Sequence, residues 1–379
     1  MKILFICENY LPHYGGAEVV FKNLAESYAI KGHNVALLTH QIKGTKKREE
    51  MGAVKVIRVP SFNSRYIFSF SAILKAIKLA KHCDVIQTTT FNGTFPAWIA
   101  AKVCRKPIVI TVHEVWVNKW RKVTSFPRWK CFIHDLLERA IYLLPYDQYV
   151  CVSNATKKDL LKLGINENKV KTIYNGLDYN FWNKNNFSDK KVQEIKEQLN
   201  LKKKVGYYAS GRPGESKGFE TFIKAIPLIK SKVPNSFFLL ALGSVEKYKR
   251  KHLELLALIK KLRIEKEIKV MNSVPYEELG HYLKAANYVV VPSLAEGFGY
   301  TTVEAVAMEK PVIVSNAGSL PEVVSGKHLI FKKGSPIDLA EKAIQTNQGQ
   351  YEKSKMKKFL WQNSVQSYLR VYERLLNRF

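Results

Sequence analysis

Residues 288–305 read YVVVPSLAEGFGYTTVEA, which is a short apolar run, a glycine turn and the beginning of a helical pattern. The run Tyr288–Val291 is apolar throughout and does not alternate with polar residues. This is typical of a strand that is buried on both faces, as in a parallel sheet covered by helices. The stretch therefore predicts a strand followed by a turn at the carboxyl end of the strand and then a helix.

The same succession recurs along most of the chain. In the first half the strand-like runs are Ile3–Cys7, Val35–Thr39, Val54–Val59, Val85–Thr88, Ile108–Val112 and Gln148–Val152, and the helical patterns are Ala17–Lys31, Ala72–Lys81, Thr94–Val103 and Ala155–Leu163. In the second half the corresponding segments are Val205–Ala209, Phe219–Lys230, Phe237–Leu242, His252–Leu262, Ile268–Met271, Tyr288–Val291 and Val312–Ser315. Alternating strands and helices predict an α/β fold with two Rossmann-like, doubly wound domains.

The domain boundaries follow from where this alternation stops. It is interrupted over residues 174–204, which begin with the turn-forming stretch Tyr174–Asp178 and continue as a polar segment. We therefore expect one domain over residues 1–176 and a second over residues 177–356. Residues 357–379 carry apolar side chains at helical spacing, and we expect this closing helix to pack back on the first domain.

The chain has 379 residues and a formal net charge of +29, which predicts anionic partners. Residues 51–130 hold fourteen basic residues and only two acidic ones, Asp84 and Glu114. The basic residues are dispersed, and no helix-turn-helix, zinc or RNA-binding signature accompanies them, so we expect no nucleic acid as partner. A basic polyanion-binding protein remains the alternative that charge alone would favour.

The cysteines and the apolar runs indicate where the protein works. The five cysteines all lie within the first 151 residues, their number is odd, and none form a C-x-x-C pair. This pattern fits free thiols in a reducing compartment. No apolar run approaches the ~18–20 residues that span a bilayer. We expect a cytoplasmic protein that is soluble or lies peripherally on the cytoplasmic face of a membrane.

Each predicted domain has one glycine turn directly after its first strand. One contains Gly15 and Gly16, and the other runs from Ser210 to Gly218. Glycine lets the backbone approach an anion, and the amides at a helix start favour phosphate. Neither turn has the spacing of a nicotinamide-binding or P-loop motif. In the second turn Arg212 and Lys217 add two cations, which suits a diphosphate.

The third turn carries two carboxylates, Glu296 in the loop and Glu304 inside the following helix. Carboxylates at a ligand-facing helix start would oppose phosphate, but they can accept hydrogen bonds from the hydroxyls of a sugar or ribose. A glycosidase carboxylate pair is the competing interpretation. Cations placed to bind a diphosphate would serve no purpose in a glycosidase, so we rank that interpretation low.

Together these motifs resemble the donor site of the family 4 retaining glycosyltransferases of GT-B fold. The resemblance rests on Gly211-Arg212 with Lys217-Gly218 and on the glutamates 296 and 304 of the third turn, and it extends over essentially the whole chain. In the first domain Gly15–Glu18, Thr111–Glu114 and Val152–Ala155 are similar to further motifs of that family. Pro213 and Glu114 depart from its usual residues. The resemblance implies two domains that face one another across a cleft.

The resemblance also implies roles for individual residues. Arg212, which follows Gly211, and Lys217 would neutralise the donor diphosphate. Backbone amides at Gly16, beside Gly15, and at Tyr300-Thr301 would donate hydrogen bonds to it. Glu304 would bind the ribose hydroxyls, while Glu296 with Phe298-Gly299 would hold the transferred sugar. His113 would contact that sugar from the first domain. The residues expected to be catalytic are therefore His113, Arg212, Lys217 and Glu296.

The aspartates bear on the use of a metal. The chain has seven, at positions 84, 135, 147, 159, 178, 189 and 338, and none are two apart. The D-x-D motif by which many transferases hold a divalent ion is therefore missing. We expect a metal-independent, hexosyltransferase-type enzyme of glycan biosynthesis with no cofactor, whose donor is a UDP-, GDP- or ADP-sugar. Retention of configuration is implied by the resemblance alone.

The acceptor side is expected in the first domain, where Val115–Leu144 interleaves aromatic and basic residues. Such a helix suits an anionic membrane surface, where each basic residue contributes ~1 kcal/mol. The alternative is a core helix with one solvated face. We hypothesise a lipid-linked or glycan acceptor. A nucleotide-sugar epimerase of the same fold and a non-catalytic sugar-nucleotide-binding module are the remaining alternatives.

Overall fold

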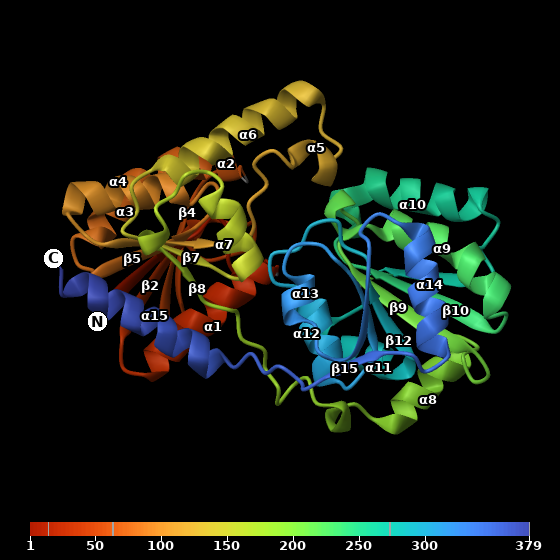
Figure 1. Ribbon diagram of the computed structural model, residues 1–379. Coiled ribbons are helices and arrows are strands. Elements are labelled where there is room, and N and C mark those ends of the chain that lie inside the picture. Colours follow the sequence, from red (N-terminus) through yellow and green to blue (C-terminus); the bar gives the residue numbers. More distant parts are fainter. Residues whose placement is uncertain (14, 63, 273, 379) are drawn as a thin grey trace. The chain divides into compact units, whose positions relative to one another are not determined.

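The computed structural model describes residues 1–13, 15–62, 64–272 and 274–378. The chain forms two compact units, each built on one mainly parallel sheet (Figure 1). The first unit holds Met1–Asn118, Arg128–Gly176 and Phe359–Phe379, and the second holds Lys119–Pro127 and Leu177–Lys358. The predicted architecture of two Rossmann-like α/β domains is confirmed. That they face one another across a cleft stays a prediction.

The first unit contains an eight-stranded sheet in the order β3-β4-β2-β1-β5-β6-β7-β8. Its strands are β1 (Lys2–Ile6), β2 (Asn34–His40), β3 (Arg48–Met51), β4 (Val54–Val59), β5 (Val85–Thr89), β6 (Ile108–Val112), β7 (Gln148–Cys151) and β8 (Val170–Thr172). All neighbours pair in parallel except β3, which runs antiparallel to β4. The strands β2, β3 and β4 lie on one side of β1, and β5 pairs with β1 on its other side. The winding direction therefore reverses between β1 and β5.

Helices cover both faces of this sheet (Figure 1). They are α1 (Gly16–Ile30), α2 (Arg65–Ser71), α3 (Ile73–Ala80), α4 (Thr94–Cys104), α6 (Arg128–Leu143), α7 (Asn154–Leu161), the 3-10 turn η1 (Glu167–Lys169) and α15 (Trp361–Leu376). Apolar residues of α2, α3, α4 and α6 share one core cluster with the inner strands. The other face is covered by α1 and α15, which contact each other through Tyr28 and Tyr372.

The second unit contains a seven-stranded sheet in the order β11-β10-β9-β12-β13-β14-β15. Its strands are β9 (Val205–Gly211), β10 (Ser236–Leu242), β11 (Ile268–Asn272), β12 (Tyr288–Val291), β13 (Val312–Ser315), β14 (Gly326–Phe331) and the antiparallel β15 (Glu352–Ser354). Its helices are α5 (Trp120–Val123), α8 (Asp189–Gln198), α9 (Phe219–Lys232), α10 (Lys249–Lys261), α11 (Leu279–Ala285), α12 (Tyr300–Ala307), α13 (Leu320–Val323) and α14 (Pro336–Asn347), with 3-10 turns η2 (Lys184–Asn186), η3 (Glu215–Lys217), η4 (Val245–Tyr248) and η5 (Tyr276–Glu278). Here the winding direction reverses between β9 and β12.

The closing helix α15 belongs to the first unit. Its Tyr368 hydroxyl lies 3.1 Å from Thr111 Oγ1, and its Tyr372 hydroxyl donates to Gln87 Oε1. Trp361 packs on Gly176 so closely that a Cβ at Gly176 would lie 2.5 Å from Trp361 Cα. The chain re-enters the first unit at Phe359 and not at residue 357. Lys357 still belongs to the second unit, where its backbone amide donates to the Ser325 hydroxyl.

Residues 119–127 depart from the expected domain range of 1–176. The chain leaves the first unit after Asn118, forms the short helix α5 and returns at Arg128. In this segment α5 contacts η3, which lies in the second unit. The expected single helix over Val115–Leu144 is consequently wrong: the segment contains two helices, α5 and α6, and Val115 and Val117 are buried ahead of them.

Candidate functional site

In the second unit, the predicted donor-site residues gather where the winding of the sheet reverses. β9 and β12 are parallel neighbours, so their carboxyl ends lie side by side. The loop after β9 contains Arg212 and leads through η3 into α9, and the loop after β12 contains Glu296 and leads into α12. Ligands of open α/β sheets bind outside the carboxyl ends of the strands at such a reversal.

Backbone hydrogen bonds fix these two loops to each other. The amides of Leu294 and Ala295 both donate to the Ser216 carbonyl, at 2.7 and 3.3 Å. Gly218 has a φ of +64°, and a Cβ there would lie 2.0 Å from the Pro292 carbonyl oxygen. Only glycine can therefore stand at position 218 without a shift of the backbone.

An ion pair joins the functional side chains of the two loops. Lys217 Nζ lies 2.8 Å from Glu296 Oε2, and the Ser293 hydroxyl donates to the same oxygen at 3.0 Å. The Glu296 backbone is held as well, because the Ser319 amide donates to its carbonyl at 3.1 Å. The Glu296 carboxylate is thus fixed beside the cation that is expected to bind the diphosphate.

The second carboxylate, Glu304, lies on α12 and is half-buried. Burial raises the pKa of Glu304 to about 8, and the nearby Lys217 ammonium acts in the opposite direction. A carboxyl group with this pKa is mostly protonated at neutral pH while no ligand is bound. Lys217 thus lies near both glutamates of the third turn.

Three helix starts beside predicted site residues, one in the first unit and two in the second, lack side-chain caps. The N-cap residues of α1, α9 and α12 are Gly15, Gly218 and Gly299, and none of them offers a side-chain acceptor. By contrast α2, α7, α8 and α14 begin with serines whose hydroxyls accept from their first-turn amides. Uncapped amides leave the positive end of a helix available to an anion. The amides of Tyr300 and Thr301 lie at such a start, and Phe298 is buried with its ring 5.1 Å from that of Tyr300.

The loop after β9 carries the exposed Arg212 and borders a small cavity. Arg212 is exposed and forms no ion pair with any residue that the structure describes. A cavity of about 150 Å³ lies next to the loop, and its lining includes Lys122 of α5, Gly214, Glu215 and Lys251. The position of Lys122 at this loop was not predicted, because no local pattern indicates that α5 packs on η3.

In the first unit, the predicted residues lie around the start of α1 and the end of β6. Tyr14, which precedes Gly15 in the predicted turn, lies outside the described residues. Gly15 is the N-cap residue of α1, and His13 Nδ1 lies 3.2 Å from Glu18 Oε1 in the first turn of that helix. Glu18 was missed as a site residue, although it lies one turn inside the helix that the glycine turn opens.

His113 follows β6 and packs edge-on against Phe21 of α1, with ring centroids 6.3 Å apart. Burial lowers the pKa of the His113 imidazole to about 4, and the Glu18 carboxylate acts weakly in the opposite direction. Its Nε2 is buried without a hydrogen-bond partner among the described residues. A neutral imidazole with an unsatisfied nitrogen is suited to bond a ligand hydroxyl.

The structure therefore brings together Gly211, Arg212, Lys217, Glu296, Phe298, Gly299, Tyr300, Thr301 and Glu304 in the second unit, and Gly15, Gly16 and His113 in the first. The described part of the chain holds no group of three or more His, Cys, Asp or Glu side chains that could bind a metal ion. None of its described helices is long and apolar enough to cross a membrane.

Comparison with protein families identifies the chain. Residues 14–181 match the model of Glycosyltransferase Family 4, and residues 190–359 match that of Glycosyl transferases group 1. The chain belongs to the group 1 glycosyltransferases of the family 4 type. Such a glycosyltransferase is a hexosyltransferase-type enzyme that uses a nucleotide-sugar donor.

Relatives of this glycosyltransferase occur in distant organisms. The uncharacterized glycosyltransferase MJ1607 of Methanocaldococcus jannaschii is 27% identical over 342 residues, which are 86% of this chain and 83% of the relative. The GPI3 subunit of phosphatidylinositol N-acetylglucosaminyltransferase of Saccharomyces cerevisiae is 22% identical over 89% of this chain and 72% of its own. Among solved structures, Anabaena Alr3699/HepE in complex with UDP and glucose superposes with a TM-score of 0.74 at 18% identity and covers 99% of this chain and 100% of that one. This superposition supports the GT-B fold.

Proposed function

We propose that this glycosyltransferase transfers a hexosyl group from a nucleoside diphosphate sugar to a lipid-linked or glycan acceptor, with retention of configuration and without a metal ion. The observation that carries the proposal is the cluster of Lys217, Glu296 and Glu304 beside the uncapped starts of α9 and α12. This arrangement combines a cation for phosphate with acceptors for hydroxyls.

The donor diphosphate would be bound by Arg212, Lys217 and the amides of Tyr300 and Thr301. When the bond between the anomeric carbon and the phosphate oxygen breaks, negative charge develops on that oxygen. Fixed cations and amides stabilise this charge without reorganisation, and the loss of one such group typically costs ~10²-fold in rate. The two cations would do here what a divalent ion does in metal-dependent transferases.

The sugar and the ribose would be bound by the carboxylates. Glu296 accepts hydrogen bonds from hydroxyls of the transferred sugar, and Glu304 accepts them from the ribose. His113 supplies a neutral imidazole nitrogen to the sugar. The acceptor oxygen forms its bond to the anomeric carbon on the face that the phosphate leaves, and its proton passes to the departing phosphate oxygen.

The acceptor would be presented at an anionic membrane surface, on the cytoplasmic face. Helix α6 buries only Cys131, Glu138 and Tyr142. Its exposed side chains include six large apolar ones: Trp129, Phe132, Ile133, Leu136, Leu137 and Leu143. Arg128 and Lys130 accompany them at the start of the helix. An apolar face with basic residues beside it is suited to the boundary between lipid headgroups and acyl chains.

The donor is tested first by thermal shift with UDP-, GDP- and ADP-sugars, since a ligand at 100 times its Kd adds ~2.7 kcal/mol to stability. The donor that binds is then incubated with membrane lipid extract in the presence of EDTA. The expected result is an acceptor-dependent product with retained anomeric configuration by NMR. A loss of activity with EDTA that Mg²⁺ or Mn²⁺ restores would overturn metal independence, and an epimerised sugar without acceptor would overturn transfer.

Flotation with liposomes tests the membrane surface separately. The protein is expected to float with vesicles of phosphatidylglycerol and not with neutral phosphatidylcholine vesicles. Substituting Phe132 with serine should reduce this binding, whereas substituting Gln366, an exposed residue of α15, should not. Absence of binding to both kinds of vesicle would overturn the membrane location.

A further inference from the structure

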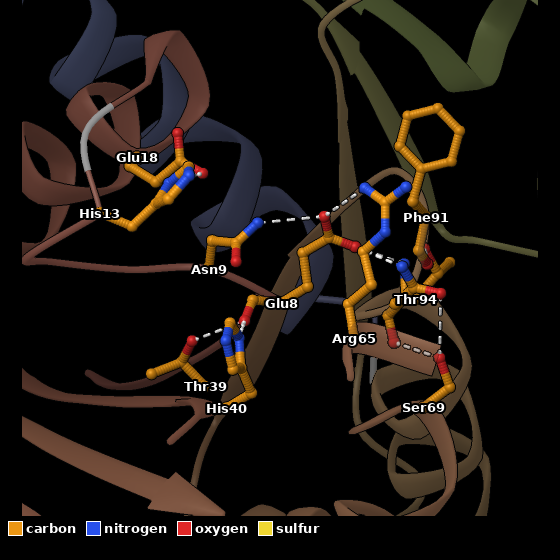
Figure 2. A network of polar contacts seen from close by, with 11 residues as sticks. Glu8, Asn9, His13, Glu18, Thr39, His40, Arg65, Ser69, Phe91 and Thr94 are labelled. Atoms are coloured by element: carbon orange, nitrogen blue, oxygen red, sulfur yellow. Dashed lines mark hydrogen bonds and ion pairs between the residues drawn. The ribbon is translucent and has the colours of Figure 1, made fainter. Parts of the chain in front are cut away.

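A second polar cluster lies where the winding of the first sheet reverses, between β1 and β5. Glu8 follows the end of β1 (Figure 2). Asn92 follows β5. The two strands are parallel neighbours, so the residues after their carboxyl ends meet. This is the position in the first unit that corresponds to the donor loops of the second, and it is where open α/β sheets bind ligands.

The Glu8 carboxylate is held by several donors. Its side chain is 13% exposed. The Asn92 amide and Nδ2 donate to Oε2 at 3.2 and 2.6 Å, and Asn9 Nδ2 donates to Oε1 at 3.1 Å. The Ser69 hydroxyl of α2 donates to the Asn92 carbonyl at 3.1 Å and so ties the loop to that helix. The carboxylate is therefore fixed in position.

Glu8 in turn positions Arg65, the first residue of α2. Arg65 Nη1 lies 3.6 Å from Glu8 Oε1 (Figure 2). The Arg65 guanidinium carbon lies 5.4 Å from the centre of the Tyr66 ring. The Arg65 side chain nevertheless remains 51% exposed. A guanidinium held on one side by a carboxylate keeps N–H groups for a second anion, and its planar fork matches a phosphate.

An apolar surface continues from Arg65 along the same helix and into α3. Tyr66, Phe70 and Leu74 succeed one another at intervals of four residues and are exposed, Phe70 to 67% and Leu74 to 82%. The Phe70 ring contacts that of Phe95 at the start of α4, with centroids 5.7 Å apart. Basic residues also occur on α3, where Lys75 follows Leu74. Burial together with Arg48 and Lys78 lowers the pKa of Lys75. A cation at one end of an exposed apolar strip is complementary to a phosphate attached to a hydrocarbon chain.

We propose that Arg65, positioned by Glu8 and Asn92, binds the phosphate of a lipid-linked acceptor, and that the hydrocarbon chain lies on the surface formed by Tyr66, Phe70, Leu74 and Phe95. This inference rests on the proposed transfer to a lipid-linked acceptor. It assigns that acceptor a phosphate-ester head group and places it at the reversal point of the first sheet. Arg65 is a binding residue in this scheme and takes no part in bond breaking.

Calorimetric titration with monomeric dihexanoyl phosphatidic acid and, separately, with inorganic phosphate tests the site. We expect wild-type protein to bind the lipid more tightly than inorganic phosphate. Arg65→Ala should lower lipid affinity at least tenfold, and Glu8→Gln and Arg65→Lys should lower it less. Phe70→Ser should lower the affinity for the lipid and leave the affinity for inorganic phosphate unchanged. Arg370→Ala, which removes one exposed arginine from α15 of the same unit, is the matched control and should bind as wild type does.

The outcomes separate the sources of the phosphate. Equal losses in Arg65→Ala and Arg370→Ala would overturn the site, because they would reflect net charge alone. Equal affinity of wild type for lipid and inorganic phosphate, unaffected by Phe70→Ser, would overturn the chain-binding surface and leave a site for free phosphate. Far-UV circular dichroism of each variant, with Arg65→Lys as the milder substitution, excludes misfolding as the cause of lost binding.

Donor binding by wild-type protein, measured by thermal shift in parallel, distinguishes this inference from the proposed function. If no nucleotide sugar binds but the lipid titration depends on Arg65, the transfer proposal fails and the phosphate site stands. If transfer to lipid extract occurs and Arg65→Ala leaves the acceptor KM unchanged, the site fails and transfer stands. The expected result is an acceptor KM raised about tenfold or more with a smaller change in kcat.

Discussion

Lys217 Nζ and Glu296 Oε2 lie 2.8 Å apart, although 79 residues separate them in the chain. They come from loops after two neighbouring strands, β9 and β12, and the pair forms because the amides of Leu294 and Ala295 tie those loops together. The Glu296 carboxylate thus fixes the position of the lysine that we propose to bind the diphosphate. In the proposed complex the donor would bond to both partners of this ion pair. Its phosphate would accept a hydrogen bond from Lys217, and its sugar hydroxyls would donate to Glu296.

Removing either partner of this pair should impair turnover. Lys217→Ala and Glu296→Ala are each expected to lower kcat at least ~10²-fold, as is Arg212→Ala, because each removes a group that we propose to contact the donor during bond breaking. Release of nucleoside diphosphate measures the rate. Lys224→Ala, on an exposed position of α9, is the matched control. Near-normal turnover in all three site variants would refute the assignment.

Substitution of Gly218 by alanine should disrupt the donor loop. The left-handed backbone there costs alanine about 1–2 kcal/mol, and the clash with the Pro292 carbonyl adds about 1–3 kcal/mol. Gly349→Ala is the control, because Gly349 has a φ of +77° and a Cβ added there would meet nothing within 4 Å. Urea unfolding and donor thermal shifts should show a larger loss of stability and weaker donor binding in Gly218→Ala alone; equal effects would contradict the close approach.

Glu304 should make stability depend on pH. Its pKa of about 8 in the folded state lies above its ordinary value of 4.5, so between these values the folded protein binds more protons than the unfolded chain. The stabilising contribution is complete below pH 4.5 and is lost as pH rises through 8, at up to about 1.4 kcal/mol per pH unit. Urea unfolding of wild type and Glu304→Gln from pH 5 to 9 measures the difference, which should fall with rising pH. A difference that does not change over this range would contradict the raised pKa.

His113 should make stability depend on pH in the opposite sense to Glu304. Its pKa of about 4 lies below the ordinary 6.5, so between these values the unfolded chain binds more protons. The contribution is present above pH 6.5 and is lost as pH falls through 4. The stability of wild type relative to His113→Gln should therefore rise from pH 4 to 6.5. A curve that is level or slopes downward over that interval would count against a buried neutral imidazole.

The docking of α15 should depend on Tyr372. Its hydroxyl donates to the buried Gln87, whose Nε2 donates to Thr111 Oγ1 at 2.9 Å. Tyr372→Phe leaves Gln87 Oε1 without this donor and should cost about 1–3 kcal/mol in the free energy of unfolding. Gln366→Ala, on the exposed side of the same helix, should change it little. Equal stability of the two variants would mean that the hydrogen bond contributes nothing.

Much of the fold could be predicted because its signals are local. The strands β6, β12 and β13 have the predicted bounds, since a strand buried on both faces needs an apolar run. Strand β4 also has its predicted bounds, although its apolar residues alternate with polar ones such as Lys55. The short edge strands β3 and β15 were not predicted. Their sequences, REEM and EKS, are polar, and they are strands only because a neighbouring strand offers its backbone groups for pairing.

The candidate donor-site residues can also be recognised in the sequence, because glycine turns, cations and carboxylates next to buried strands carry their chemistry in the residue types. That they bind the donor stays a prediction. The sequence by itself determined the two-domain α/β fold and the resemblance to glycosyltransferases, whereas diphosphate binding by the turn after β9 stays a prediction. Tertiary structure alone decided that Lys217 pairs with Glu296, that α5 packs on η3, and that Glu8, Asn92 and Arg65 meet. Residues far apart in the chain come together only where neighbouring parallel strands end, and no local pattern encodes which strands are neighbours.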